Sequence, residues 1–285
     1  MMKKELDIPE AWLEMKPKRL AGTVLVVGAN DTGKSTLVSY LVDQVCGSGK
    51  RAAWLDGDIG QSTLGLPGTQ NLALLEKPQT NPSADETFFV GSTSPLGHML
   101  PVLTGLAHLQ KKALARGALT TIIDTSGLVA LNRGGGALKQ WTAELLRPST
   151  IIALQRGDEL DHLLTPWRRD ERFCLHVLPV SDAVQKRGPD KRTAYRRRQF
   201  QRYFRKAVLQ DISADAVAIY HNGKPRPGTL LALLDGQGRT LALGALQRFY
   251  SGRLSIMTPL PTVKAVRSLR GGALRIDPQS GEELS

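Results

Sequence analysis

The residues with the clearest chemical meaning in this sequence lie between Gly28 and Thr36, which read GANDTGKST. They fit the pattern G-x-x-x-x-G-K-[ST] at every fixed position. A loop of this kind turns successive backbone N–H groups toward the phosphates of a nucleotide, while its lysine and its hydroxyl residue reach the terminal phosphates and Mg²⁺. We therefore expect nucleotide binding by Gly28, Ala29, Asn30, Asp31, Thr32, Gly33, Lys34, Ser35 and Thr36.

Two acidic residues follow the next apolar segment, in the stretch LDGDIGQ at 55–61. A carboxylate at the tip of a strand beside the phosphate loop lies where the Mg²⁺ shell needs one. Because the chain turns after the strand, Asp56 and Asp58 can both reach the site, one holding a metal-bound water and the other accepting a proton. With Ser35 they form the expected metal-binding set. The alternative is a solvated acidic turn.

The sequence lacks the Asn-Lys-x-Asp segment with which guanine-nucleotide switches recognise their base. The apolar run at 150–154 leads instead into QRGD at 155–158. This argues against a Ras-like GTPase. It does not establish a preference for adenine, so GTP is not excluded.

Short apolar segments alternate with helical patterns through the first two hundred residues. Strand-like runs cover 23–27, 52–55, 88–90, 120–123, 150–154 and 173–178, and helical spacing follows the phosphate loop and recurs at 99–116 and 137–146. This alternation predicts a mostly parallel sheet flanked by helices, the α/β architecture of P-loop NTPases. The polar segment 61–86 is expected to be a surface or substrate loop, and residues 1–20 an irregular lead-in.

The pattern changes after residue 210. Short strand-like runs follow at 216–220, 230–234, 240–243, 254–257 and 274–276, and DGQG at 235–238 is a hairpin signal. We therefore expect a P-loop domain over 1–210, with a helix near 191–206, and a small β-rich C-terminal module over 211–285.

The composition is that of a soluble globular chain. Of its 285 residues 41% are apolar, with neither a signal-peptide pattern nor an apolar run of membrane-spanning length, so we expect a cytoplasmic protein without a membrane partner. The net charge of +12 would suit a nucleic-acid partner, whose phosphates it could neutralise, and a merely solubilising surface is the alternative. The two cysteines and three of the tryptophans are expected in the core: Cys46, Cys174, Trp54, Trp141 and Trp167.

Four segments in order give the sequence a family resemblance: VGANDTGKST, LDGDIGQST, FFVGSTSPLGH and IIDTSGLV. Together they resemble the polynucleotide 5′-hydroxyl kinases, which include the kinase subunit of the messenger-RNA cleavage factor and the nucleolar kinase of ribosomal-RNA processing. The resemblance implies a P-loop enzyme that uses ATP and Mg²⁺ to phosphorylate the 5′-hydroxyl of RNA or DNA. Eukaryotic members carry an extra N-terminal domain, and this sequence resembles a short form without it.

The resemblance also assigns roles to particular residues. Lys34 and Ser35 would hold phosphate and metal, and Asp58 would activate the 5′-hydroxyl, with Gln61 beside it. The turn Thr125-Ser126-Gly127 resembles the clasp over the substrate end. The family clasp continues into a tryptophan that stacks on a base, whereas this sequence has Leu128, which leaves base stacking and substrate preference open.

A strongly basic segment runs from Lys186 to Lys206 and holds ten lysines and arginines with one acid. Arg192 and Arg196 are four residues apart and share a helical face. Their spacing resembles the family's lid, whose arginines surround the transferring phosphate; Arg197 is the substitute if the alignment shifts by one. The alternatives are a solvated basic face, or a face that binds only backbone phosphates.

These observations favour a kinase that transfers the γ-phosphate of ATP to the 5′-OH end of RNA or DNA, with no protein partner evident. Lys34, Asp58, Arg192 and Arg196 are the expected catalytic residues. Two rivals remain: a P-loop GTPase or ATPase switch that uses water as acceptor, and a nucleic-acid-binding protein gated by nucleotide. The sequence does not distinguish RNA from DNA.

Overall fold

The computed structural model describes residues 8–221, 223 and 225–284, which form two units. Unit 1 contains the described residues up to Asp58, Leu72–Asp85 and Met99–Arg187. Unit 2 contains Ile59–Asn71, Glu86–His98 and the described residues from Gly188 onwards. No helix in the described ranges is long and apolar enough to cross a membrane.

A seven-stranded sheet with the order β4-β3-β2-β5-β1-β6-β7 organises the P-loop part of the chain. Five neighbouring strands of this sheet run parallel to one another, namely β2, β5, β1, β6 and β7. The central strands are buried along almost their whole length, as expected for parallel strands covered on both faces. The strands are β1 (Gly22–Gly28), β2 (Ala52–Asp56), β3 (Thr69–Leu75), β4 (Glu86–Phe89), β5 (Thr120–Asp124), β6 (Thr150–Gln155) and β7 (Cys174–Pro179).

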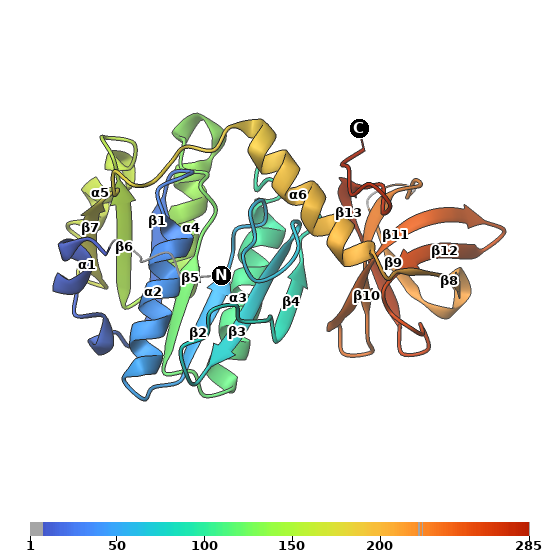
Figure 1. The fold of residues 1–285 in the computed structure, drawn as a ribbon, viewed down its shortest axis with the longest axis horizontal. Helices are drawn as coiled ribbons and strands as arrows, with labels where there is room; N and C mark the ends of the chain where they lie inside the picture. Colours follow the sequence, from blue (N-terminus) through green and yellow to red (C-terminus); the bar gives the residue numbers. More distant parts are fainter. Residues whose placement is uncertain (1–7, 222, 224, 285) are drawn as a thin grey trace. The chain divides into compact units, whose positions relative to one another are not determined.

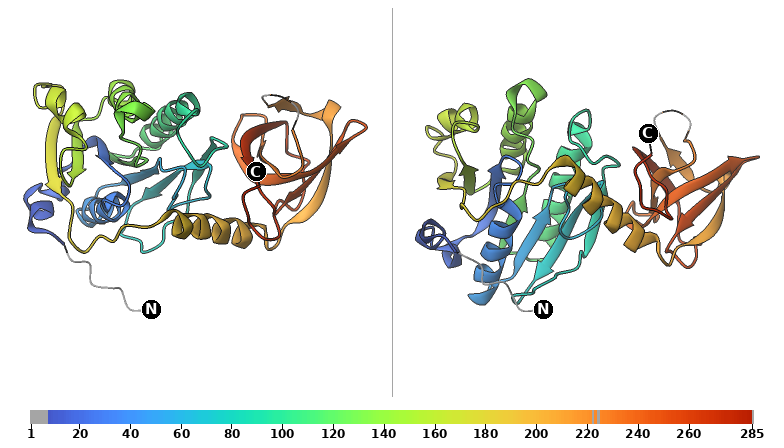
Figure 2. Two further views of the ribbon diagram at one scale, coloured as in Figure 1. Left: turned by 90° about the horizontal axis from the view of Figure 1, so that it is seen from above. Right: turned by 45° about the horizontal axis from the view of Figure 1, so that its top comes forward.

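Helices cover both faces of this sheet, with α2 on one face and α3 and α4 on the other (Figures 1 and 2). The predicted α/β P-loop architecture is therefore confirmed. The helices of unit 1 are α1 (Glu10–Glu14), α2 (Lys34–Gly47), α3 (Met99–Ala115), α4 (Gly135–Leu146) and α5 (Asp161–Trp167), with the short 3₁₀ turns η1 (Pro17–Arg19) and η2 (Leu131–Arg133). The expected irregular lead-in thus holds two short helical segments in its described part.

Unit 2 is built on a strongly bent six-stranded sheet with the order β8-β12-β11-β10-β13-β9 (Figure 2). One face of β10 contributes to a core with strands β8 to β13, and the other face packs under helix α6 through Phe200 and Phe204. The elements are α6 (Pro189–Phe204), β8 (Val208–Ser213), η3 (Ala214–Ala216), β9 (Ala218–Tyr220), β10 (Thr229–Leu234), β11 (Thr240–Tyr250), β12 (Arg253–Thr258) and β13 (Ser268–Arg275).

The expected boundary at residue 210 differs from the division into units. Helix α6 belongs to unit 2 because its aromatic residues are part of that unit's core. Two segments from the first hundred residues, Ile59–Asn71 and Glu86–His98, belong to unit 2 as well. Contacts between residues far apart in the sequence therefore set the boundary, and the change in pattern near residue 210 marks only where the β-rich part begins.

The expectation of a loop over 61–86 was wrong in its middle, where β3 is almost completely buried. The apolar pattern did not predict this strand because three of its seven residues are polar. All three are buried, and Asn71 donates to the Thr69 hydroxyl at 2.9 Å and accepts from Thr87, on the neighbouring segment, at 2.9 Å. Helix α5 and strand β8 were not expected either.

Two expected core residues are exposed. Cys174 lies on β7, an edge strand with little cover, and Trp141 lies on the outer side of α4 with 61% of its surface exposed. The other three, Cys46, Trp54 and Trp167, are buried as expected.

Candidate active site

The phosphate loop connects β1 to α2. Its course requires glycine at Gly28, for lack of space, and at Gly33, for backbone conformation. Gly33 caps the helix with φ +86°, a conformation that side chains rarely adopt. A Cβ on Gly28 would lie 2.8 Å from the carbonyl oxygen of Leu154 on the neighbouring strand. The loop therefore runs close to β6 and delivers the chain directly into the first turn of α2, where backbone N–H groups face a bound anion.

Lys34 is almost fully buried at this first turn. Its ammonium donates a 2.7 Å hydrogen bond to the carbonyl oxygen of Ala29, which also accepts a 3.0 Å hydrogen bond from the Thr32 hydroxyl. The positive charge thus lies over the loop, where the predicted role in phosphate binding requires it.

Asp124, at the carboxyl end of β5, is a site residue that the sequence interpretation did not select. The Ser35 hydroxyl donates a 2.5 Å hydrogen bond to its Oδ2, while Oδ1 is buried and has no hydrogen-bond partner among the described residues. Burial raises the pKa of Asp124 to about 7, and the charges of Asp56 and Asp58 also raise it, against the lowering effects of Lys34 and Ser35. In P-loop proteins the loop hydroxyl and a strand-end aspartate hold the metal together.

The available signal for Asp124 was the same as for Asp56. Each residue ends an apolar strand, and the two strands are neighbours, with Asp56 and Asp124 as direct partners in the register. Asp56 is completely buried, and its Oδ1 accepts a 3.2 Å hydrogen bond from the backbone N–H of Asp58. Asp58 is half-buried at the turn that follows. The structure thus brings both predicted acids to the site and adds a third.

The turn Thr125-Ser126-Gly127 comes directly after Asp124 in the sequence and packs against the phosphate loop. The Thr125 hydroxyl donates to the carbonyl of Val26 at 2.8 Å. A Cβ on Gly127 would lie 2.6 Å from the backbone nitrogen of Asn30, so the close approach of turn and loop requires glycine. The expected substrate turn and the expected nucleotide loop are therefore adjacent.

A second buried lysine, Lys139 of α4, holds this turn. Its ammonium donates to the carbonyl oxygen of Ser126 at 2.5 Å and lies 3.4 Å from the Ser126 hydroxyl. Lys139 is 1% exposed, and burial lowers its pKa to about 7; the charge of Lys34 lowers it further, whereas Asp58 and Asp124 raise it. The sequence contained only a weak indication that Lys139 is buried. The lysine occupies a position on the face of α4 where the helical spacing otherwise places apolar residues.

The other predicted site residues, Gln61, Arg192 and Arg196, belong to unit 2. The Gln61 amide donates to the carbonyl of Gly60 at 2.8 Å. Arg196 forms an ion pair with Glu283 and is largely buried, while Arg192 is half-buried on the same helix.

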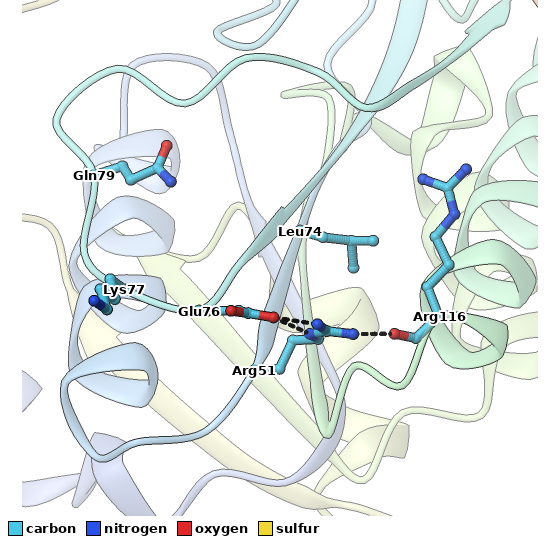
Figure 3. Close-up of a pocket in the computed structure, with 6 residues that line it drawn as sticks. All are labelled: Arg51, Leu74, Glu76, Lys77, Gln79 and Arg116. Atoms are coloured by element: carbon cyan, nitrogen blue, oxygen red, sulfur yellow. Dashed lines mark hydrogen bonds and ion pairs between the residues drawn. The ribbon is translucent and has the colours of Figure 1, made fainter.

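A shallow hollow of about 660 Å³ lies elsewhere in unit 1 and is not part of this site (Figure 3). Arg51 precedes β2, so the hollow lies at the amino end of that strand, opposite the carboxyl ends where the acids gather. The Arg51 guanidinium already forms an ion pair with the Glu76 carboxylate and donates a 2.7 Å hydrogen bond to the carbonyl oxygen of Arg116.

Comparison with known proteins agrees with this geometry. The chain is 29% identical to polyribonucleotide 5′-hydroxyl-kinase TK1956 of Thermococcus kodakarensis, over 92% of this chain and 90% of that protein. It is 26% identical to polyribonucleotide 5′-hydroxyl-kinase PH0197 of Pyrococcus horikoshii, over 92% and 88%.

The fold resembles a chain in the solved Clp1p–Pcf11p complex, with a TM-score of 0.70 and 12% identity over 93% of this chain and 77% of that one. The family model described as mRNA cleavage and polyadenylation factor CLP1 P-loop matches residues 28–206. That match covers more than half of the sequence and includes the loop, Asp56, Asp58 and Asp124, the turn and α6, and the chain therefore belongs to the CLP1 P-loop family.

Proposed function

We propose that the protein is a polynucleotide 5′-hydroxyl kinase that transfers the γ-phosphate of ATP to the 5′-OH end of RNA. The observation that carries the proposal is the packing of the turn Thr125-Ser126-Gly127 against the phosphate loop, beside the two strand-end acids Asp56 and Asp124. A hydrolase needs only a water molecule at the γ-phosphate. An ordered turn packed against the phosphate loop provides, in addition, a place where a second substrate can bind. The names of the relatives favour RNA as that substrate.

The residues present fit a magnesium ion. Mg²⁺ prefers oxygen ligands and is commonly held by one or two carboxylates together with substrate phosphates. The orphaned Oδ1 of Asp124 and the Ser35 hydroxyl supply such oxygens, with Asp56 behind them. No group of three or more His, Cys, Asp or Glu side chains in the described ranges could hold a metal alone, which fits an ion shared with the nucleotide. When bound, the ion would neutralise charge on the phosphates.

Asp58 is the proposed general base. Asp56 and Asp124 are buried, whereas Asp58 is partly exposed at the turn, where a substrate hydroxyl can approach it. In the proposed reaction the 5′-oxygen forms a bond to the γ-phosphorus, the bond from that phosphorus to the β–γ bridging oxygen breaks, and ADP leaves. Asp58 accepts the hydroxyl proton, while Lys34 stabilises charge on the β- and γ-phosphates.

Arg192 and Arg196 of α6 are proposed to act on the transferring group, with Gln61 near the acceptor. Arginine suits this role because its planar guanidinium can bind two phosphate oxygens at once. The proposal rests on their spacing and on the family match, which extends through α6.

Labelled phosphate tests the function directly. The protein is incubated with γ-labelled ATP and a 5′-OH oligoribonucleotide, with Lys34→Ala as the inactive control. Label on the oligonucleotide supports the kinase. Label released only as free phosphate would show that water is the acceptor, and no turnover at all would leave a nucleotide-gated binding protein.

A further inference from the structure

The positive charge of this protein is concentrated in its last third. From Gly188 to Ser285 the sequence has 17 lysines and arginines and seven aspartates and glutamates. The whole chain has a net charge of +12, so the rest of the sequence is nearly neutral. The phosphate loop, the acids and the turn Thr125-Ser126-Gly127 lie in unit 1, and only Gln61, Arg192 and Arg196 of the proposed transfer residues belong to unit 2, so phosphate transfer alone does not require this distribution. The charge of unit 2 needs a separate explanation.

Besides Arg192, the arginines of α6 and Arg205, which directly follows the helix, fall into two groups. Arg196 and Arg197 are neutralised by the C-terminal acids: Arg196 pairs with Glu283, and Arg197 pairs with Glu282 at 3.0 Å. A second group, Arg198, Arg202 and Arg205, forms no ion pair within the part of the chain that the structure describes. Like the first group they are on a helix fixed in the core by Phe200 and Phe204.

These three arginines line one groove of about 610 Å³ that lies entirely in unit 2. Their spacing of four and three residues places them on one side of the helix, over about 10 Å of its length. Phe204, Ala207, Met257 and Pro278 provide apolar surface, and Gln201 and Gln279 complete the lining. No acidic side chain takes part. The groove thus combines unneutralised cations with an apolar lining, as grooves for single-stranded nucleic acid do.

We propose that this groove binds the sugar–phosphate backbone of the polynucleotide substrate, at nucleotides other than the reacting 5′ end. The inference rests on the proposed kinase function for the identity of the polyanion. The guanidinium groups bind the phosphates, and the apolar residues contact sugars or bases. None of the residues in the groove belongs to the transfer site, so the groove adds affinity for long substrates without entering the chemistry.

The test compares a long and a short acceptor. The triple variant Arg198→Ala/Arg202→Ala/Arg205→Ala is measured beside a charge-matched control, Lys111→Ala/Arg168→Ala/Arg169→Ala, whose three residues are exposed on unit 1. Binding of a fluorescent 5′-OH 20-mer is followed by anisotropy across a salt series, and phosphorylation kinetics are measured with the 20-mer and with a trinucleotide. Thermal melting checks that both variants are folded.

We expect the groove variant to bind the 20-mer at least about tenfold more weakly and to reduce the log–log salt slope by about two, since each phosphate contact on a single strand contributes about 0.7. Its KM for the 20-mer should rise while kcat, and both constants for the trinucleotide, stay unchanged. The control variant should change the slope much less. The variant Arg198→Lys/Arg202→Lys/Arg205→Lys should bind the 20-mer more tightly than the alanine variant, because it keeps the charge.

Three results would overturn the inference: wild-type affinity of the groove variant for the 20-mer, an equal loss with the trinucleotide, or an equal loss in the control variant. A change in oligomeric state without a change in oligonucleotide binding would identify the groove as a protein interface instead. Because anisotropy requires no turnover, a wild-type protein that binds RNA through the groove but transfers no phosphate would contradict the proposed function and leave the groove in place.

Discussion

The ammonium of Lys139 and the carbonyl oxygen of Ser126 are 2.5 Å apart in a part of unit 1 where Lys139 is almost completely excluded from solvent. A lysine is rarely buried unless a partner compensates for its lost hydration. Here the partner is the backbone of the proposed substrate turn. The hydrogen bond from this lysine therefore supports the geometry of the turn.

Lys139→Met should impair the acceptor more than the nucleotide. The variant keeps the length of the side chain but loses the hydrogen bond, and a small misplacement at a reacting group can cost about a hundredfold in rate. We expect kcat/KM for a 5′-OH oligonucleotide to fall about 10- to 100-fold, with the dissociation constant of ATP nearly unchanged. Lys111→Met, on the exposed side of α3, is the matched control. Equal losses in ATP and oligonucleotide affinity would contradict the role in the turn.

Stability should depend on pH through the same lysine. Burial lowers its pKa in the folded protein to about 7 from the ordinary lysine value of 10.5, so the unfolded chain binds the extra proton between these values. The free energy of unfolding should therefore rise with pH from about 7 to about 10, and the burial penalty should be fully present below 7. Urea unfolding of wild type and Lys139→Met without nucleotide measures this. Parallel curves for the two proteins would show that the pKa of Lys139 is not lowered.

Asp124→Asn should weaken the dependence of activity on Mg²⁺. An amide next to the Ser35 hydroxyl preserves the size of the side chain but not its charge, so a metal shared with the nucleotide is held less well. We expect transfer to fall at least about a hundredfold at low Mg²⁺ and to recover partly at high Mg²⁺. Asp215→Asn, an exposed acid of unit 2, should behave like wild type. A loss that is independent of Mg²⁺ would argue against Asp124 as a ligand.

Asp58→Asn should affect turnover, whereas Asp56→Asn should affect metal use. A general base contributes about 10²–10⁴-fold to rate, so the Asp58 variant should lose that factor in kcat with ATP affinity retained. Asp56 is buried behind the site, and its substitution should shift the Mg²⁺ optimum. Steady-state kinetics across Mg²⁺ concentrations compare the two. If only the Asp58 variant shifts the optimum, the two roles are reversed.

Arg196 is paired with Glu283, and this pairing gives a test of the proposed lid. If Arg196 must leave Glu283 to reach the phosphoryl group, Arg192→Ala and Arg196→Ala should each reduce kcat about a hundredfold, while Glu283→Gln should leave kcat unchanged or higher. Lysine at either position should rescue poorly. If Glu283→Gln is as damaging as Arg196→Ala, the ion pair is structural and Arg197 becomes the next candidate.

The phosphate loop and the central strands were predictable because each has a strong local pattern. The loop spacing of Gly28, Gly33 and Lys34 requires a strand before it and a helix after it, and both are present. Strand β3 and Lys139 were not predictable for a common reason. Each places polar groups inside the protein, and their partners, such as Thr87 for Asn71 and Ser126 for Lys139, are supplied by other segments.

The acids show an intermediate case. Asp56 and Asp124 both end apolar strands, but only their pairing in the sheet shows that they meet. The division into units depends on the packing of Phe200 and Phe204 of α6 against the strands of unit 2, and the spacing of residues along the helix does not show what they cover.

The contact between Gly127 and Asn30 has a consequence for how such proteins can diverge. The loop and the turn approach so closely that a single methyl group on Gly127 would collide with the backbone of residue 30. Neither segment can change its course alone. A mutational path toward a different donor or a different acceptor must therefore move both segments in concert, and libraries that randomise one of them while fixing the other will sample mostly inactive proteins.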